Sequence, residues 1–256
     1  MTPVGPTGKV AVGFFSFTEV TDPAEHRAYN EWHMLDHLPE QIPLPGVVHG
    51  QRWVSAPPEK AARRVDEEPL APVHYLTCYL MSEPAADTLR GFYDLGAHLR
   101  AAGRFHRHRR AHLSGPWRAL RAVAAPRVRV SPGAVPYRPH RGVHVSVDEG
   151  GEGEALDAHL AWTDVTRLPA LLEVPGVAGV WTFTTTPDLA RYHRDETPRR
   201  ITLCFVDGDL LETSAAIDEA EATAAADAPD AGVRTVLAGP FRTITPWGWD
   251  WFDAGA

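Results

Sequence analysis

The sequence is poor in cysteine and has no long apolar run. Among its 256 residues, Cys78 and Cys204 are the only thiols, and each lies in a short apolar segment typical of a strand. A buried reduced cysteine behaves as a small hydrophobic residue, so we expect no disulfide. Residues 1–8 lack the basic and apolar stretches of a secretory signal. No segment approaches the roughly 18–20 apolar residues of a membrane span, so we expect a cytoplasmic protein.

The usual motifs of nucleotide and hydrolase chemistry are also missing. The sequence has no G-x-G-x-x-G, no P-loop, no G-x-S-x-G and no cysteine pair with zinc spacing. Its 25 basic and 33 acidic residues give a formal net charge of -8, which repels nucleic acid and anionic membranes. A small-molecule partner is therefore the best expectation. The hydrophobic content of 44% is enough for a sizeable core.

The first half of the chain carries a strand–helix–strand–strand–helix–strand pattern. Short β-branched and aromatic segments indicate strands, and apolar residues at helical spacing indicate helices. In chain order we expect a strand at 9–18, a helix at 24–40, strands at 47–54 and 73–81, a helix at 83–102 and a strand at 113–123. The polar stretch at 57–72 is expected to be an exposed loop.

The same order of elements recurs after a proline-rich segment. We expect strands at 142–148, 176–185, 201–207 and 233–245, and helices at 154–172 and 210–227.

Individual residues recur as well. Trp32 and Leu38-Pro39 match Trp162 and Leu168-Pro169, 130 residues later; YLTCYL at 75 matches ITLCFV at 201, and LSGPWR at 113 matches LAGPFR at 237. Matches in a constant order indicate an internal duplication. We predict an N-terminal repeat at 1–125, a linker at 126–139 and a C-terminal repeat at 140–256.

The segment YNEWHMLDHLPEQIPLPGVVHGQRW, at 29–53, resembles the dimeric α/β-barrel superfamily and within it the EthD-like proteins. The resemblance implies an α+β fold in which tandem ferredoxin-like βαββαβ repeats form an intramolecular α/β barrel. It also points to His37, in the H-L-P turn, as the polar group aimed at the pocket. It implies no single chemistry, because relatives include cofactor-free monooxygenases, isomerases, polyketide cyclases and haem proteins.

A difference between the repeats places the candidate catalytic residues in the first one. Tyr29, His33 and His37 are four residues apart and share one helix face, with Asp36 in the adjacent row. A histidine at the C-terminal end of a helix has its cationic form favoured. We therefore expect His37 to have a pKa near neutrality and to act as a general acid or base, assisted by Asp36 or Tyr29.

The candidate substrate-binding residues come from the same helix and from the strand after it. Trp32 and His33 lie on the helix, and His49, Gln51 and Trp53 alternate along one strand face. These strand residues either line the same cavity as His37 or form a solvated strand edge.

Three further features leave alternatives open. His33 and His37 have metal-ligand spacing, but two histidines alone are a weak signal, so we expect no metal and no cofactor. The run RFHRHRRAH at 104–112 either binds an anionic group or forms a solvated helix end. The tail PWGWDWFD at 246–253 either folds back to plug the barrel mouth or seals a dimer contact.

The leading hypothesis is a cofactor-independent enzyme that acts on a hydrophobic, aromatic or polyketide-like metabolite through histidine general acid–base chemistry. Cyclase, isomerase, lyase and monooxygenase reactions all fit. The alternatives are a non-catalytic small-molecule-binding protein and a haem- or metal-binding member of the superfamily. No nucleic acid or membrane partner is expected, and a homodimer is compatible with the sequence.

Overall fold

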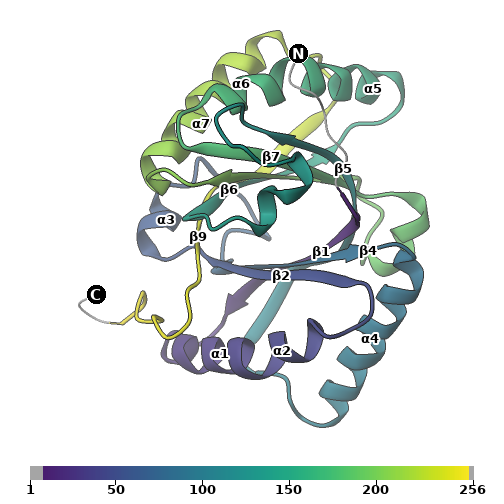
Figure 1. The fold of residues 1–256 in the computed structure, drawn as a ribbon, viewed down its shortest axis with the longest axis vertical. Helices are drawn as coiled ribbons and strands as arrows, with labels where there is room; N and C mark the ends of the chain where they lie inside the picture. The colour runs from purple at the N-terminus through teal and green to yellow at the C-terminus, as the bar shows by residue number, and fades with distance from the viewer. Residues whose placement is uncertain (1–7, 254–256) are drawn as a thin grey trace.

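The computed structural model describes residues 8–253 and contains the expected order of elements twice (Figure 1). Residues 1–7, and with them most of the segment examined for a secretory signal, lie outside the described residues, as do residues 254–256. None of the helices within 8–253 combines the length and the apolar character that a bilayer span requires.

The first unit confirms the predicted elements with small shifts of their ends. Its strands are β1 (Val10–Val20), β2 (Val47–Val54), β4 (Tyr75–Ser82) and β5 (Arg109–Ala124). Its first helical segment is continuous, with η1 (Pro23–Glu25), α1 (His26–Trp32), a π-helical turn η2 (His33–His37) and α2 (Leu38–Gln41). Its second helix is α4 (Ala85–Ala101).

The second unit follows the same plan. Its strands are β6 (Gly142–Gly150), β7 (Val177–Thr184), β8 (Arg199–Val206) and β9 (Val233–Thr243). Its helical segments are α5 (Gly153–Trp162), a π-helical turn η4 (Thr163–Arg167), α6 (Leu168–Glu173), η5 (Pro187–Tyr192), α7 (Leu210–Ala224) and η6 (Ala225–Asp227). The segment between the units contains the short helix η3 (Pro132–Tyr137).

The strands form one antiparallel sheet in which the two units are joined at two places, β5 with β7 and β2 with β9. The strand order is β2-β4-β1-β5-β7-β8-β6-β9-β3, and β2 also pairs with β9. Where β2 pairs with β9, Trp53 lies opposite Thr243 and Val54 lies opposite Arg242. Strand β5 pairs with β7 at the other junction. The fold is thus α+β, with the strands of one unit bonded to those of the other twice.

The main core lies between the units, and the helices lie outside the strands. Side chains from both units, including Phe15, Trp117, Val145, Trp181 and Leu203, form one buried apolar cluster. Figure 1 shows α1, α2 and α4 outside the strands of the first unit, and α5 to α7 outside those of the second. The four main strands of each unit therefore have an inner face in the shared core and an outer face toward the helices of that unit.

The strand register corrects the sequence match between the cysteines by one residue. Phe15 pairs with Cys78 in the first unit, and the corresponding Val145 pairs with Leu203 in the second. Cys78 lies in the core between the units, whereas Cys204 packs under the helices of its own unit. Because a shift of one residue reverses the face of a strand, Cys78 corresponds to Leu203 and not to Cys204. Both cysteines are free and buried, as expected.

The polar stretch at 57–72 is not the exposed loop that was expected. It contains α3 (Pro57–Ala61) and β3 (Val65–Asp66), and β3 pairs with β9. The carboxylate of Glu59 is fully buried, and its Oε1 accepts a hydrogen bond from Nε of Arg242 at 2.9 Å. Composition missed these elements because a buried glutamate in the stretch pairs with an arginine of the other unit, although much of the stretch is exposed.

The aromatic tail folds back, but onto the first helix. Trp249 is 4% exposed and packs with Tyr29 and Tyr75. The ring of Phe252 stacks on that of His26, with centroids 3.6 Å apart. Figure 1 shows the tail beside α1. These contacts cover Trp249 and part of Phe252, whereas Trp247 remains 75% exposed.

Candidate functional site

A cavity of about 660 Å³ lies between the outer face of the first unit's sheet and its helices. Its walls come from β1, β4, β5, α4 and the helical segment that contains η2, together with residues from the segment after β7. The wall is aromatic and cationic: it includes Phe14, Tyr79, Phe92, Tyr93, Phe105 and Tyr192, the arginines Arg100, Arg109, Arg110 and Arg194, and the histidines His33 and His37.

The π-helical turn η2 presents both histidines to this cavity. His33 and His37 are 4% and 9% exposed, and their ring centroids are 5.1 Å apart. The indole of Trp32 stacks on the His37 ring, with centroids 4.7 Å apart and 24° between the planes. Turns of this kind are rare and recur at functional sites. The second unit has the same turn, η4, so the turn itself belongs to the repeated scaffold and only its side chains differ.

Burial keeps both imidazoles neutral. It lowers the pKa of His37 to about 4, and the nearby Arg109 lowers it further. Burial also holds the pKa of His33 well below its usual value, with Arg52 as the next cause. The expectation of a His37 pKa near neutrality is therefore wrong. The helical segment does not end at His37 but continues through Gln41, and desolvation disfavours the cation.

Asp36 and Tyr29 are not among the residues that line the cavity. Asp36 accepts hydrogen bonds from Nη2 and Nε of Arg104 at 2.9 and 3.2 Å. Tyr29 is 1% exposed and packs against Tyr75, with ring centroids 4.7 Å apart. The tertiary contacts of these two side chains therefore direct them away from the cavity.

His49, Gln51 and Trp53 lie on the inner face of β2, away from this cavity. They line a narrow space of about 10 Å³ in the shared core, beside Cys78 and Trp181. Nε2 of His49 is 3.0 Å from Oε1 of Gln51. Trp53 donates a hydrogen bond from Nε1 to Nε2 of His140 at 3.1 Å. The structure therefore groups these three residues with one another, as their alternation predicts, but not with His37.

Several cavity residues were missed by the sequence analysis. The hydroxyl of Tyr79 and Oε1 of Gln41 are buried and have no hydrogen-bond partner within the described residues. Cys78 points into the shared core, and neighbouring residues of a strand point to opposite faces, so Tyr79 could have been assigned to the outer face. Arg109 and Phe105 belong to the 104–112 run, whose charge was noted without a location.

The second unit has a smaller pocket, of about 290 Å³, with an internal ion network in its wall. Nη1 of Arg167 lies 3.2 Å from Oδ2 of Asp148, and Nη2 lies 2.9 Å from Oε1 of Glu221. These carboxylates raise the pKa of Arg167. The matching residues of the first unit are His37, Thr18 and Gly96.

The register supports these matches. Asp148 pairs opposite Thr235 as Thr18 pairs opposite Ala111, and Thr213 packs against Gly176 as Thr88 packs against Gly46. The first unit thus lacks the internal anions that the second unit has.

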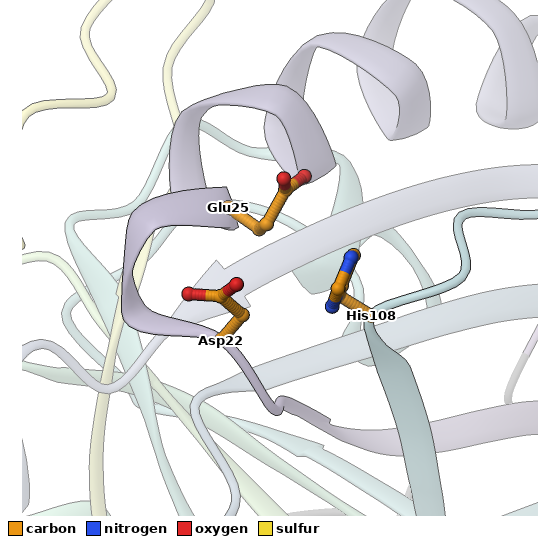
Figure 2. Close-up of side chains that lie close together, drawn as sticks. All are labelled: Asp22, Glu25 and His108. Atoms are coloured by element: carbon orange, nitrogen blue, oxygen red, sulfur yellow. The ribbon is translucent and has the colours of Figure 1, made fainter.

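A separate cluster of Asp22, Glu25 and His108 lies at the start of the first helical segment (Figure 2). Its candidate ligand atoms lie within 4.8 Å of one another. Each member has another contact: Asp22 accepts from the backbone N–H of Ala24, Glu25 lies 3.2 Å from Nε2 of His106, and His108 accepts from Arg107. These contacts account for the cluster without a metal ion.

No protein-family model matches the sequence, and no curated protein is detectably similar to it. Solved structures do match in fold. A candidate chlorite dismutase has a TM-score of 0.56 and 10% identity, over 95% of this chain and 98% of that chain. An anthrone oxidase-like protein has a TM-score of 0.51 and 9% identity, over 95% of both chains.

A variant of the chlorite dismutase from Candidatus Nitrospira defluvii has a TM-score of 0.50 and 12% identity, over 96% of this chain and 94% of that chain. At such low identity these matches show the fold alone. They support the ferredoxin-like α+β fold over nearly the whole chain and give no specific support to the EthD-like resemblance.

The contrast between the two units predicts that substitutions at the matched positions Arg167 and His37 lower the free energy of unfolding by different amounts. Arg167→Leu leaves Asp148 and Glu221 buried without their cation, so we expect the free energy of unfolding to fall by roughly 3–5 kcal/mol. His37→Ala removes a side chain from a cavity wall, and we expect a loss of only about 1 kcal/mol. Urea denaturation at pH 7.5 measures both values. Equal losses of unfolding free energy in the two variants would contradict the view that Arg167 is a structural residue and His37 is not.

Proposed function

We propose that the chain is a cofactor-independent enzyme that binds an aromatic or polyketide-like metabolite in the N-terminal cavity, where His37 acts as a general base. The observation that carries this proposal is a neutral imidazole in the wall of a large aromatic cavity. Cavities of this size hold drug-sized ligands and are lined mainly by apolar and aromatic side chains.

The proposed chemistry begins with removal of a proton from a benzylic carbon that is conjugated through an aromatic ring to a ketone, as the methylene of an anthrone is. A neutral His37 accepts that proton, and the stacked Trp32 holds its ring in place. The negative charge spreads to the ketone oxygen, where the Tyr79 hydroxyl and the cavity arginines are suited to stabilise it. A positioned general base contributes about 10²- to 10⁴-fold to such a step. Cyclisation, isomerisation, elimination and oxygenation can each follow from the resulting carbanion.

The proposal extends to the architecture. The pairing of β2 with β9 closes the strand order into an intramolecular α/β barrel. In this interpretation, 1–125 and 140–256 are diverged copies of one ferredoxin-like repeat, joined by 126–139. The C-terminal copy serves as the wall that covers the inner face of the functional copy.

Haem binding is the second candidate function, and the donor set favours it. A haem needs an axial imidazole with a free ring nitrogen, and cations for its propionates. Nδ1 of His33 and Nδ1 of His37 are buried and have no partner within the described residues. Arg100 and Arg109 line the same cavity. These residues fit the group: either histidine would hold the iron and the arginines the propionates, and bound haem would supply redox chemistry.

A C–H exchange assay tests the general base. Under anaerobic conditions in deuterated buffer, the protein should accelerate deuterium exchange at the methylene of 1,8-dihydroxyanthrone, followed by NMR. His37→Ala should lower this rate by about 10²- to 10⁴-fold. The rate should also fall below about pH 4, because protonation of His37 removes the base.

His49→Ala is the matched control, because His49 lies on the other sheet face, and it should exchange at the wild-type rate. Full exchange activity in His37→Ala would remove His37 from the mechanism.

A haemin titration separates the two candidate functions. If the cofactor-free proposal holds, purified protein should give no Soret shift that saturates at one haemin per chain. A saturating Soret band that is lost in His37→Ala or His33→Ala would instead establish the haem-binding function.

A further inference from the structure

The N-terminal cavity has an excess of positive charge in an acidic protein. Arg100, Arg109, Arg110 and Arg194 line it, while its wall includes no aspartate or glutamate from the described residues. Of these four, only Arg110 lies near a carboxylate, with its Nη1 3.9 Å from Oε2 of Glu19. The net charge of the whole chain is -8, so carboxylates are plentiful elsewhere. The charge of the cavity is therefore local.

Four carboxylates beside the 104–112 run contact arginine or histidine side chains of that run, whereas Asp22, beside His108, forms no ion pair within the described residues. The pairs are Arg104 with Asp36 and Glu40, His106 with Glu25, and His112 with Glu19. All of these pairs lie outside the cavity wall. These residues fit the solvated segment, one of the two alternatives for this run. Arg109 is the member that enters the cavity without a counter-ion.

Arg109 is partly buried and its guanidinium has no ionic partner within the described residues. Its guanidinium forms no ion pair and no side-chain hydrogen bond within residues 8–253, and its nearest aromatic contact is Phe105, at 5.4 Å from the ring centroid. Burial lowers its pKa, so its surroundings oppose the charge. A desolvated cation is costly unless an anion accompanies it. The matching position of the second unit is Val233, where no such cost arises.

The rest of the cavity specifies an aromatic partner for that cation. Phe14 of β1 and Phe92 of α4 pack with centroids 4.7 Å apart and 46° between the ring planes. Tyr93 of α4 stacks on Tyr192, from the second unit, with centroids 5.0 Å apart. Arg100 lies over the ring of Phe105 at 4.9 Å. Flat ring walls and a guanidinium fork together match a planar molecule that ends in a carboxylate.

We propose that the cavity selects aromatic carboxylates and that Arg109 is the residue that binds the carboxylate. This inference rests on the proposed function, because it names the substrate class of the same cavity. It places the ligand's charged end at Arg109 and its rings against the aromatic wall that leads to His33 and His37.

Calorimetric titration with 2-naphthoate and its neutral isostere 2-naphthamide tests the inference at pH 7.5. Wild-type protein should bind 2-naphthoate at least tenfold more tightly than 2-naphthamide. Arg109→Gln should weaken 2-naphthoate binding at least tenfold and leave 2-naphthamide binding within twofold, while Arg109→Lys should recover part of the difference. Arg107→Gln is the matched control, since Arg107 is an exposed member of the same run that does not line the cavity.

Stability gives a second readout. Removal of an unpaired desolvated cation should leave the thermal midpoint of Arg109→Gln equal to that of the wild type or higher, whereas a structural arginine would give a lower one.

The outcomes separate this inference from the proposed function. Equal binding of the two probes by wild-type protein, or no binding of either, would overturn the inference, as would unchanged discrimination in Arg109→Gln. If 2-naphthoate is preferred but His37→Ala keeps full exchange activity, only the general-base proposal fails. If His37→Ala loses exchange but charge has no effect on binding, only the carboxylate inference fails.

Discussion

The burial of the two inner sheet faces against each other is the constraint on which the rest of the structure depends. Each unit has its helices on one face only, so the other face needs a cover, and the shared cluster around Phe15, Trp117 and Trp181 provides it. Strand pairing at both junctions fixes the two units in place. Because this core is filled with apolar side chains, the largest cavity lies under the helices of the first unit. Under its helices, each unit can change without loss of the common core.

The two units have used that freedom in different ways. Both keep the π-helical turn, which presents two side chains toward the outer face of the sheet. In the second unit the turn presents Arg167, and Asp148 and Glu221 neutralise it from within. In the first unit the turn presents histidines, and the cation, Arg109, comes from β5 without an internal anion. The charge of Arg167 is thus neutralised within the second unit, whereas the charge of Arg109 is free to bind an anionic ligand.

The sequence predicted the fold well because the fold follows from local periodicity and repetition. Apart from the short α3, β3, η3 and η5, the elements appear near the expected positions, and the two-histidine turn lies in a cavity wall. The side-chain directions were less predictable. His33 and His37 share the cavity as predicted, but Tyr29 packs against Tyr75 and Asp36 binds Arg104, and these tertiary contacts have no sequence pattern. The pKa of His37 depends on burial, which the helix-end argument ignored. The role of Arg109 depends on which neighbours take the nearby carboxylates, and that is set by tertiary contacts.

The central claim is that His37 is a buried, neutral imidazole in the wall of a cationic cavity whose charge an anionic ligand balances. Nitrogen-15 NMR of the His37 ring as a function of pH measures this directly. The account predicts a pKa of about 4 in the free protein. It predicts a higher pKa when 2-naphthoate is bound, because a nearby anion favours the protonated ring. A pKa near 6.5 that does not respond to 2-naphthoate would show a water-exposed histidine and contradict the account.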